Sequence, residues 1–427
     1  MNEMFRRSDF NGDLSKWDTS SVTNMAAMFN GAVQFSPASL NWNTEKVTDM
    51  AQMFVQALRF NADIANWNTS QVTIMHDMFF YAAAFNSDIS KWQTSKATNM
   101  LNMFRMCSKF NSELAEWDTS QVTQMDQMFQ GTAKFNSDIS KWKTTYVTSF
   151  FMMFSRSAFN QNIGEWDTSA AANMEKMFAN TEFFNNDIGK WDISKVQYMT
   201  EMFHNAQAFN QDLSKWDVSN VEDFRYMFQS THSFNSDISK WNPDHPTNSM
   251  FGMFEGSQAF NIDISKWSTG AAELTRMFSG ATGFNRTLCG DKWTAPGKAN
   301  VNDDVLAGSN GRYGCCEVGS FMSNPFGPFN STDGGGSCLA CPTGWKATDD
   351  VPHVNVNCTR CESGKSSISK STSCTSCARG RKLVTAEPLV WYVLILYIII
   401  CRFLFYLIHS HFCNSFPLLF FSVFLPQ

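Results

Sequence analysis

The chain has 427 residues and a formal net charge of −6 at pH 7. Charged residues make up only 17 % and no Lys/Arg run is longer than two residues, which argues against nucleic-acid binding. With 40 Phe, 24 Met and 14 Trp, the chain has enough large apolar side chains to bury a core, so global disorder is not expected.

Tryptophan recurs about every 25 residues over the first two thirds of the chain. The positions are Trp17, Trp42, Trp67, Trp92, Trp117, Trp142, Trp166, Trp191, Trp216, Trp241, Trp267 and Trp293. The surrounding sequence reads F-N-x-D-I-S-K-W-D-T-S-x-V-T-x-M-x-x-M-F-x-x-A, and FNSDISKW ends unchanged at three of these tryptophans. A fixed period of this length predicts about eleven stacked units that bury one another's apolar faces.

Each unit is predicted to have two halves. In the first full copy, Val22, Met25, Met28, Phe29 and Ala32 form one apolar stripe, which predicts an amphipathic helix. Thr19 or Ser20 would cap that helix. Residues 13–18 are expected to form a short strand or extended segment. The predicted fold class is therefore an α/β repeat solenoid of strand–helix units spanning residues 1–288.

The W-D-T-S-x-V-T-x-M-x-x-M-F pattern resembles the BspA-like, leucine-rich-repeat-related surface protein repeats, the DUF285 family. The resemblance covers residues 1 to about 288. It implies a leucine-rich-repeat-like solenoid at a cell surface, and adhesion is the function usually suggested for such repeats.

Stacking converts each repeat position into a column of side chains. An Asn column is expected to satisfy backbone groups of the turns, and a Met column that begins at Met28 is expected to fill the core. An exposed Lys column precedes the tryptophans, interrupted by Glu116 and Glu165. Its members are Lys16, Lys91, Lys141, Lys190, Lys215, Lys240 and Lys266.

The Lys column has three interpretations, because Asp columns such as those of Asp13 and Asp18 flank it. The charges can simply compensate one another on a solvated face. The column can instead be a ligand face for an acidic glycan or a protein. A third interpretation has the Asp columns bridged by calcium, which makes a secreted calcium- or metal-binding repeat protein the alternative function.

No constellation of catalytic residues is visible in the sequence. The seven His are scattered and share no repeat position, and no phosphate-binding loop or metalloprotease motif occurs. The sequence thus predicts a structural or interaction scaffold that is not an enzyme, needs no cofactor and binds a protein or glycan.

Cysteines gather after the repeats. Residues 289–337 are expected to form a capping region and a Gly-rich linker, and residues 338–380 a cysteine-rich module. That module carries three C-x-x-C pairs, Cys338, Cys341, Cys358, Cys361, Cys374 and Cys377. They are disulfide candidates, with a zinc ribbon as the alternative. The segment resembles the ephrin-receptor-like, growth-factor-receptor-like cysteine-rich repeats of ectodomains.

Further signals concern the location of the protein. Asn68, Asn285 and Asn330 lie in glycosylation sequons, which suits an extracellular protein. Residues 389–408 form an apolar run long enough to span a bilayer. That run has three interpretations: a single-pass anchor, non-coding sequence translated in error, or a removable lipid-anchor signal. Met1 falls inside a repeat and no signal peptide precedes it, so we expect an N-terminally truncated, membrane-anchored surface protein.

Overall fold

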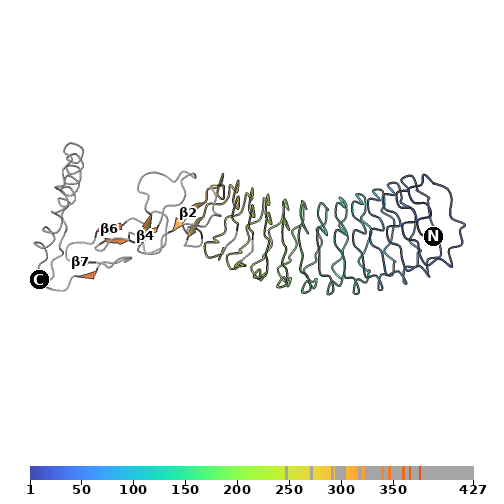
Figure 1. The fold of residues 1–427 in the computed structure, drawn as a ribbon, viewed down its shortest axis with the longest axis horizontal. Helices are drawn as coiled ribbons and strands as arrows, with labels where there is room; N and C mark the ends of the chain where they lie inside the picture. The colour runs from blue at the N-terminus through green and yellow to red at the C-terminus, as the bar shows by residue number, and fades with distance from the viewer. Residues whose placement is uncertain are drawn as a thin grey trace, which may run out of the picture.

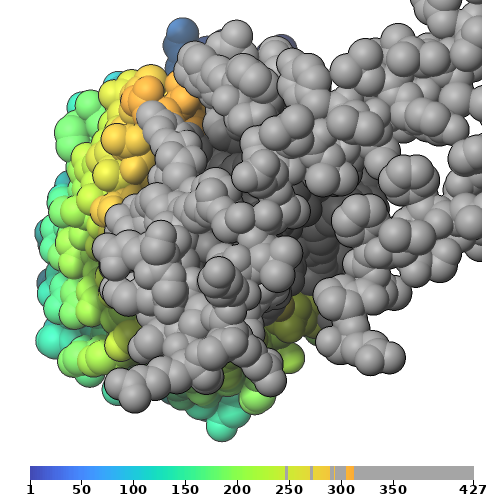
Figure 2. Space-filling view, turned by 90° about the vertical axis from the view of Figure 1, so that its left-hand side faces the viewer, coloured from blue at the N-terminus to red at the C-terminus, as the bar shows by residue number. Residues whose placement is uncertain are grey.

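The computed structural model describes residues 1–245, 249–269, 273–289, 293, 304–315, 320–322, 338–340, 345–347, 358–360, 365–366 and 375–376. Over the repeats the chain winds into a long stack in which each repeat makes one pass, called a rung below (Figure 1). Seen along the long axis, the rungs lie one behind another (Figure 2). The predicted repeat array is present, but its rungs are not built from the predicted elements.

The segment predicted as a helix is a run of turns. Met28 N–H donates to Met25 O at 3.3 Å and Ala32 N–H to Phe29 O at 2.9 Å, so the bonds within the rung span three residues. The N–H groups between them leave the rung, as when Phe29 donates to Met53 O at 2.9 Å. The described part of residues 1–289 contains no helix. The predicted α/β solenoid of leucine-rich-repeat-like strand–helix units is therefore wrong.

Two left-handed residues in each rung explain why no helix forms. Ala27 has φ of 52° and Gly31 has φ of 77°, and each is the third residue of a turn. A positive φ at that place is what a type II turn requires, and it cannot occur within a right-handed helix. The same two positions recur in later rungs, for example at Asp77 and Tyr81 with φ of 57° and 62°.

The segment predicted as a strand is also a set of turns. Trp17 N–H donates to Leu14 O at 3.2 Å, and the Asp13 carboxylate accepts Ser15 N–H at 2.8 Å. Thr19 does not cap a helix, because its buried hydroxyl donates to Asn43 O of the next rung at 2.9 Å. Side-chain acceptors of this kind favour turns over regular structure because they satisfy backbone donors locally.

Isolated parallel bridges join neighbouring rungs, all but Ser39↔Asp63 at one position of the repeat. They run from Asn24↔Asp49 through Asp49↔Ile74 and onward to Ser249↔Glu273. A single paired residue per rung gives the contact of a parallel sheet without a strand on either side. Hydrogen bonds along the stack replace those that a helix would have made within itself, which keeps the buried backbone satisfied.

The core consists of stacked apolar columns. Phe29 lies against Phe35 of its own rung at a centroid distance of 3.8 Å and against Phe54 of the next rung at 5.6 Å. Trp42 and Trp67 stack at 6.0 Å. The Met column is fully buried, which confirms its predicted place in the core: Met28, Met53, Met78, Met103, Met128 and Met153.

The described residues beyond the repeats form short paired strands. β1 (Thr287–Cys289) pairs in parallel with β2 (Arg312–Cys315). β3 (Ser320–Met322) pairs antiparallel with β4 (Cys338–Ala340), β5 (Trp345–Ala347) with β6 (Cys358–Arg360), and β7 (Lys365–Ser366) with β8 (Thr375–Ser376). Val305 is buried, and Phe278 N–H donates to its carbonyl at 2.8 Å, so residues 304–315 cover the last rung.

Candidate functional site

The predicted Lys column lies on the surface of the stack. All seven of its lysines are exposed. The two glutamates that interrupt the column form pairs along it: Lys141 Nζ lies 3.1 Å from Glu116 Oε1, and Lys190 pairs in the same way with Glu165. Since both partners of each pair are largely exposed, these contacts contribute little to stability.

The Asp columns beside the lysines hold turns in place. Asp88 accepts Ser90 N–H at 2.9 Å, and Asp138 accepts Ser140 N–H at the same distance. Hydrogen bonds from the serine backbone and hydroxyl hold the pKa of each carboxyl below its ordinary value. Within the described residues, no group of three His, Cys, Asp or Glu side chains is placed to hold a metal ion.

The Asn column is a ladder of side chain-to-backbone bonds. The side-chain oxygen of Asn111 accepts Asn136 N–H at 2.7 Å, and that of Asn136 accepts Asn160 N–H at 2.8 Å. The bond recurs in nearly every rung at 2.7–3.0 Å. The predicted structural role of these asparagines is confirmed.

Cys107, the cysteine that lies among the repeats, is fully buried. Its Sγ donates to Phe79 O at 2.9 Å, and burial raises the pKa of the thiol. Cys107 is thus placed as a small core residue and not as a reactive thiol.

Another surface was not singled out from the sequence. Five positions of the repeat carry different residues from one rung to the next. They are the residue before the first Met of M-x-x-M-F, the two residues between the Mets, and the two residues after the Phe. We call this set of positions the variable face. In the rung that follows Trp67 it consists of Ile74, His76, Asp77, Phe80 and Tyr81. The signal in the sequence is the set of x positions in x-M-x-x-M-F-x-x, which an amphipathic helix would place outside its apolar stripe.

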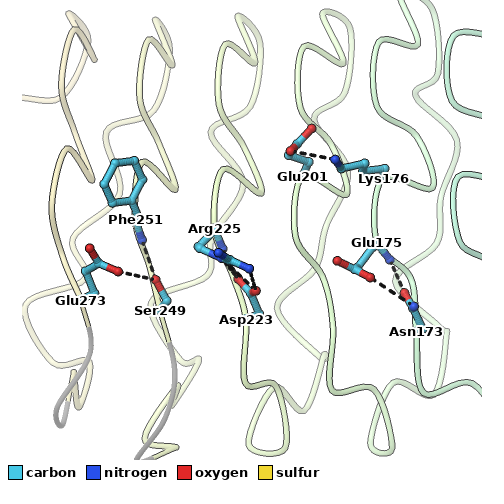
Figure 3. Close-up of polar contacts among 9 residues, drawn as sticks. All are labelled: Asn173, Glu175, Lys176, Glu201, Asp223, Arg225, Ser249, Phe251 and Glu273. Atoms are coloured by element: carbon cyan, nitrogen blue, oxygen red, sulfur yellow. Dashed lines mark hydrogen bonds and ion pairs between the residues drawn. The ribbon is translucent and has the colours of Figure 1, made fainter.

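Contacts on the variable face differ from rung to rung (Figure 3). Lys176 Nζ lies 3.1 Å from Glu201 Oε1, which joins two neighbouring rungs. In the next rung Arg225 instead pairs within its own rung, 2.6 Å from Asp223 Oδ2. Elsewhere Arg105 lies over the Phe80 ring, 5.0 Å from its centroid. The backbone is the same in each case, so the difference comes from the side chains alone.

The other predicted sites are only partly within the described residues. Asn68 and Asn285 are exposed, as a glycosylation site requires, but Asn285 N–H also belongs to the Asn ladder. Cys338 and Cys358 begin β4 and β6. The following disulfide and glycosylation candidates lie outside the described residues: Cys341, Cys361, Cys374, Cys377 and Asn330.

The predicted membrane segment, residues 389–408, also lies outside the described residues. In the part of the chain that the structure describes, no helix is long and apolar enough to cross a bilayer.

Comparisons with known proteins bear on the repeats alone. The family described as "Mycoplasma protein of unknown function, DUF285" matches residues 1–114, 81–187, 155–251 and 215–305, in overlapping copies. The likeness of residues 338–380 to ephrin-receptor-like repeats is not supported. No curated protein and no solved structure matches the chain. Because the matched copies together span residues 1–305, well over half of the sequence, the chain belongs to the DUF285 family.

Proposed function

We propose that the rung array is a non-catalytic interaction scaffold at a cell surface, which binds a protein or glycan and supports adhesion. One observation carries this proposal: the chain keeps its buried columns nearly constant and varies the five positions of the variable face rung by rung. A stack of rungs that each contact only their neighbours gives an extended surface held at fixed spacing, which suits multivalent binding.

The surface location has support of its own. The clustered cysteines beyond the repeats and the exposed Asn68 sequon both suit an oxidising, extracellular compartment. A protease added to intact source cells should then remove the repeat array, while a cytosolic control protein stays whole. An array that is cleaved only after the cells are permeabilised would contradict the location.

Adhesion is tested with beads that carry the full chain. We expect them to attach to surfaces coated with extracellular-matrix proteins or glycans more strongly than beads that carry serum albumin. Soluble chain should compete with the attachment. Beads that attach no better than the albumin beads to any coated surface would contradict the scaffold function.

A further inference from the structure

We infer that the variable face binds the irregular surface of a folded protein, a proposal that rests on the scaffold function above and names its partner class. The first step is a comparison within the chain. Every rung has the same backbone, so a position needed for that backbone carries nearly the same residue in each rung, as the Met and Phe columns do. Positions that carry different residues in different rungs are therefore not needed to form the rung backbone.

The second step concerns periodicity. A ligand built of identical units, such as a regular glycan chain, is matched by identical residues at rung spacing, and the Lys column has that form. The variable face does not. Its first position carries, in order, Asn24, Asp49, Ile74, Asn99, Gln124, Ser149, Asn173, Tyr198, Asp223, Ser249 and Glu273. A row that changes between acidic, amide, aliphatic and aromatic side chains complements a surface without a repeat.

Unsatisfied polar atoms provide an independent observation. Among the described residues, five side-chain N or O atoms are buried without a hydrogen-bond partner, and all five belong to the variable face. They are Asn102 Oδ1, Arg105 Nε, Gln130 Oε1, Thr200 Oγ1 and His204 Nδ1. Buried polar atoms ordinarily find partners because an unpaired one is destabilising. The Asn ladder satisfies this rule and the variable face does not, so the polar side chains of the variable face are not explained by the hydrogen bonding of the array.

One cluster on the variable face has the composition of an interface anchor. Tyr81 is 43 % exposed and Ile74 is 36 % exposed, although both are large and apolar in part. Phe80 lies between Tyr81, with a ring-centroid distance of 6.2 Å, and the Arg105 guanidinium. Aromatic residues and Arg contribute most of the binding energy in protein interfaces, where they become desolvated near the centre.

Charge on the variable face also favours a protein over a polyanion. Lys176 pairs with Glu201, and Arg276 pairs with Glu255, so these positive side chains already have acidic neighbours. A polyanionic glycan requires an excess of positive charge, whereas protein interfaces match both signs locally.

The test uses the full chain as a probe on two arrays, one of folded extracellular protein domains and one of glycans that includes heparin. The anchor variant carries Phe80→Ser, Tyr81→Asn and Arg105→Ser; Asn suits position 81 because φ there is 62°. The control variant carries Lys141→Gln, Lys215→Gln and Lys240→Gln. We expect protein domains that bind the native chain to bind the anchor variant about tenfold more weakly or worse, and the control variant within about twofold.

Folding of each variant is checked by its thermal midpoint, and Tyr81→Asn alone replaces the anchor variant if the triple change unfolds the chain. Protein binding that the anchor change leaves intact would overturn the inference. Binding confined to glycans, or lost in the Lys variant, would also overturn it while leaving the scaffold function standing. If the chain binds nothing on either array, both the inference and the proposed scaffold function are wrong.

Discussion

Trp142 joins its rung to the preceding one in two ways. Trp142 stacks on Trp117 with a centroid distance of 6.3 Å, and its Nε1–H donates to Leu114 O at 3.0 Å. The indole therefore combines apolar burial with the satisfaction of a carbonyl inside the core. An aromatic ring without a donor could make the stack but would leave that carbonyl unpaired.

Trp142→Ala should lower the free energy of unfolding by ~3–5 kcal/mol, as large-to-small substitutions in a core do. Lys141→Ala, next to it on the exposed side, should change the same quantity by less than about 0.5 kcal/mol. Urea denaturation of both variants measures the difference. Similar losses in the two variants would show that the buried and exposed sides have been assigned wrongly.

The Asn ladder permits a matched pair of substitutions. Asn136→Ala removes the acceptor for Asn160 N–H, a bond of 2.8 Å, and should cost about 1 kcal/mol of unfolding free energy. Asn136→Asp keeps an oxygen at the same place and should cost less. If Ala and Asp destabilise the chain equally in urea denaturation, the ladder bond does not stabilise the array.

The turn is the element from which the rungs are made. The sequence correctly indicated which residues of M-x-x-M-F face inward, since Met25, Met28 and Phe29 are fully buried. It did not indicate the element, because a helix and two successive turns place the same positions on one side. Gly31 and Gly131 at the left-handed position were a usable signal, but Tyr81 and Arg156 occupy that position in other rungs and obscure it.

A glycine at that position tests the turn geometry. Gly256 has φ of 67°, and a Cβ added there would approach Ser230 Oγ at an ordinary 3.4 Å. Gly256→Ala should therefore introduce backbone strain without a clash and destabilise the chain by about 1 kcal/mol. Gly256→Asn should cost less, because Asn tolerates a positive φ. Thermal denaturation of the two variants compares them, and an Ala variant as stable as the native chain would contradict the left-handed geometry.

Because aspartate side chains accept hydrogen bonds within the turns, the stability of the chain should decrease at low pH. In the folded chain, hydrogen bonds from Ser90 and Ser140 hold the pKa of Asp88 and Asp138 below the unfolded value of about 3.9. A depressed pKa in the folded state stabilises the chain above the unfolded pKa. That stabilisation is lost as the pH falls through the folded pKa. The urea midpoint should thus fall as the pH is lowered below about 4.

Asn supplies the control for this titration. Asn162 occupies the same repeat position as Asp138, and its side-chain oxygen accepts Gly164 N–H at 3.0 Å. Asp88→Asn combined with Asp138→Asn should therefore keep both turns and reduce the loss of stability in acid. An unchanged pH profile in the double variant would mean that other carboxyl groups control the acid response.

At the scale of the whole molecule, the stack needs a cover at its C-terminal end. Residues 304–315 supply buried Val305 and the partner strand of β1. A chain that ends at residue 293, which keeps the buried Trp293, should lose ~2–4 kcal/mol of unfolding free energy relative to one that ends after residue 315, from the buried Val305 side chain and a few hydrogen bonds. Urea denaturation of both chains tests this, and equal midpoints would show that residues 304–315 do not stabilise the array.

The surface of the array was only partly predictable. The repeat spacing predicted that Lys141 and its column lie on the outside, because charged side chains are rarely buried and the neighbouring Trp occupies the core. The variable face depends on where a turn directs its neighbours, which periodicity alone does not determine. Phe80 and Arg105 occupy the same repeat position, so stacking predicts that they are neighbours, but the exposure of Tyr81 beside Phe80 follows from the turn.

Hydrogen bonds that join one rung to the next run along the long axis of the stack, as the bonds from Met25 to Asp49 and from Phe29 to Met53 show. Tension applied between the two ends would load these bonds one rung at a time, since the outermost rung can peel away before the next is strained. Each release would free about 80–90 Å of chain, the extended length of one repeat. The molecule would then lengthen in equal steps under load and dissipate energy at each step, as a tether between moving bodies must.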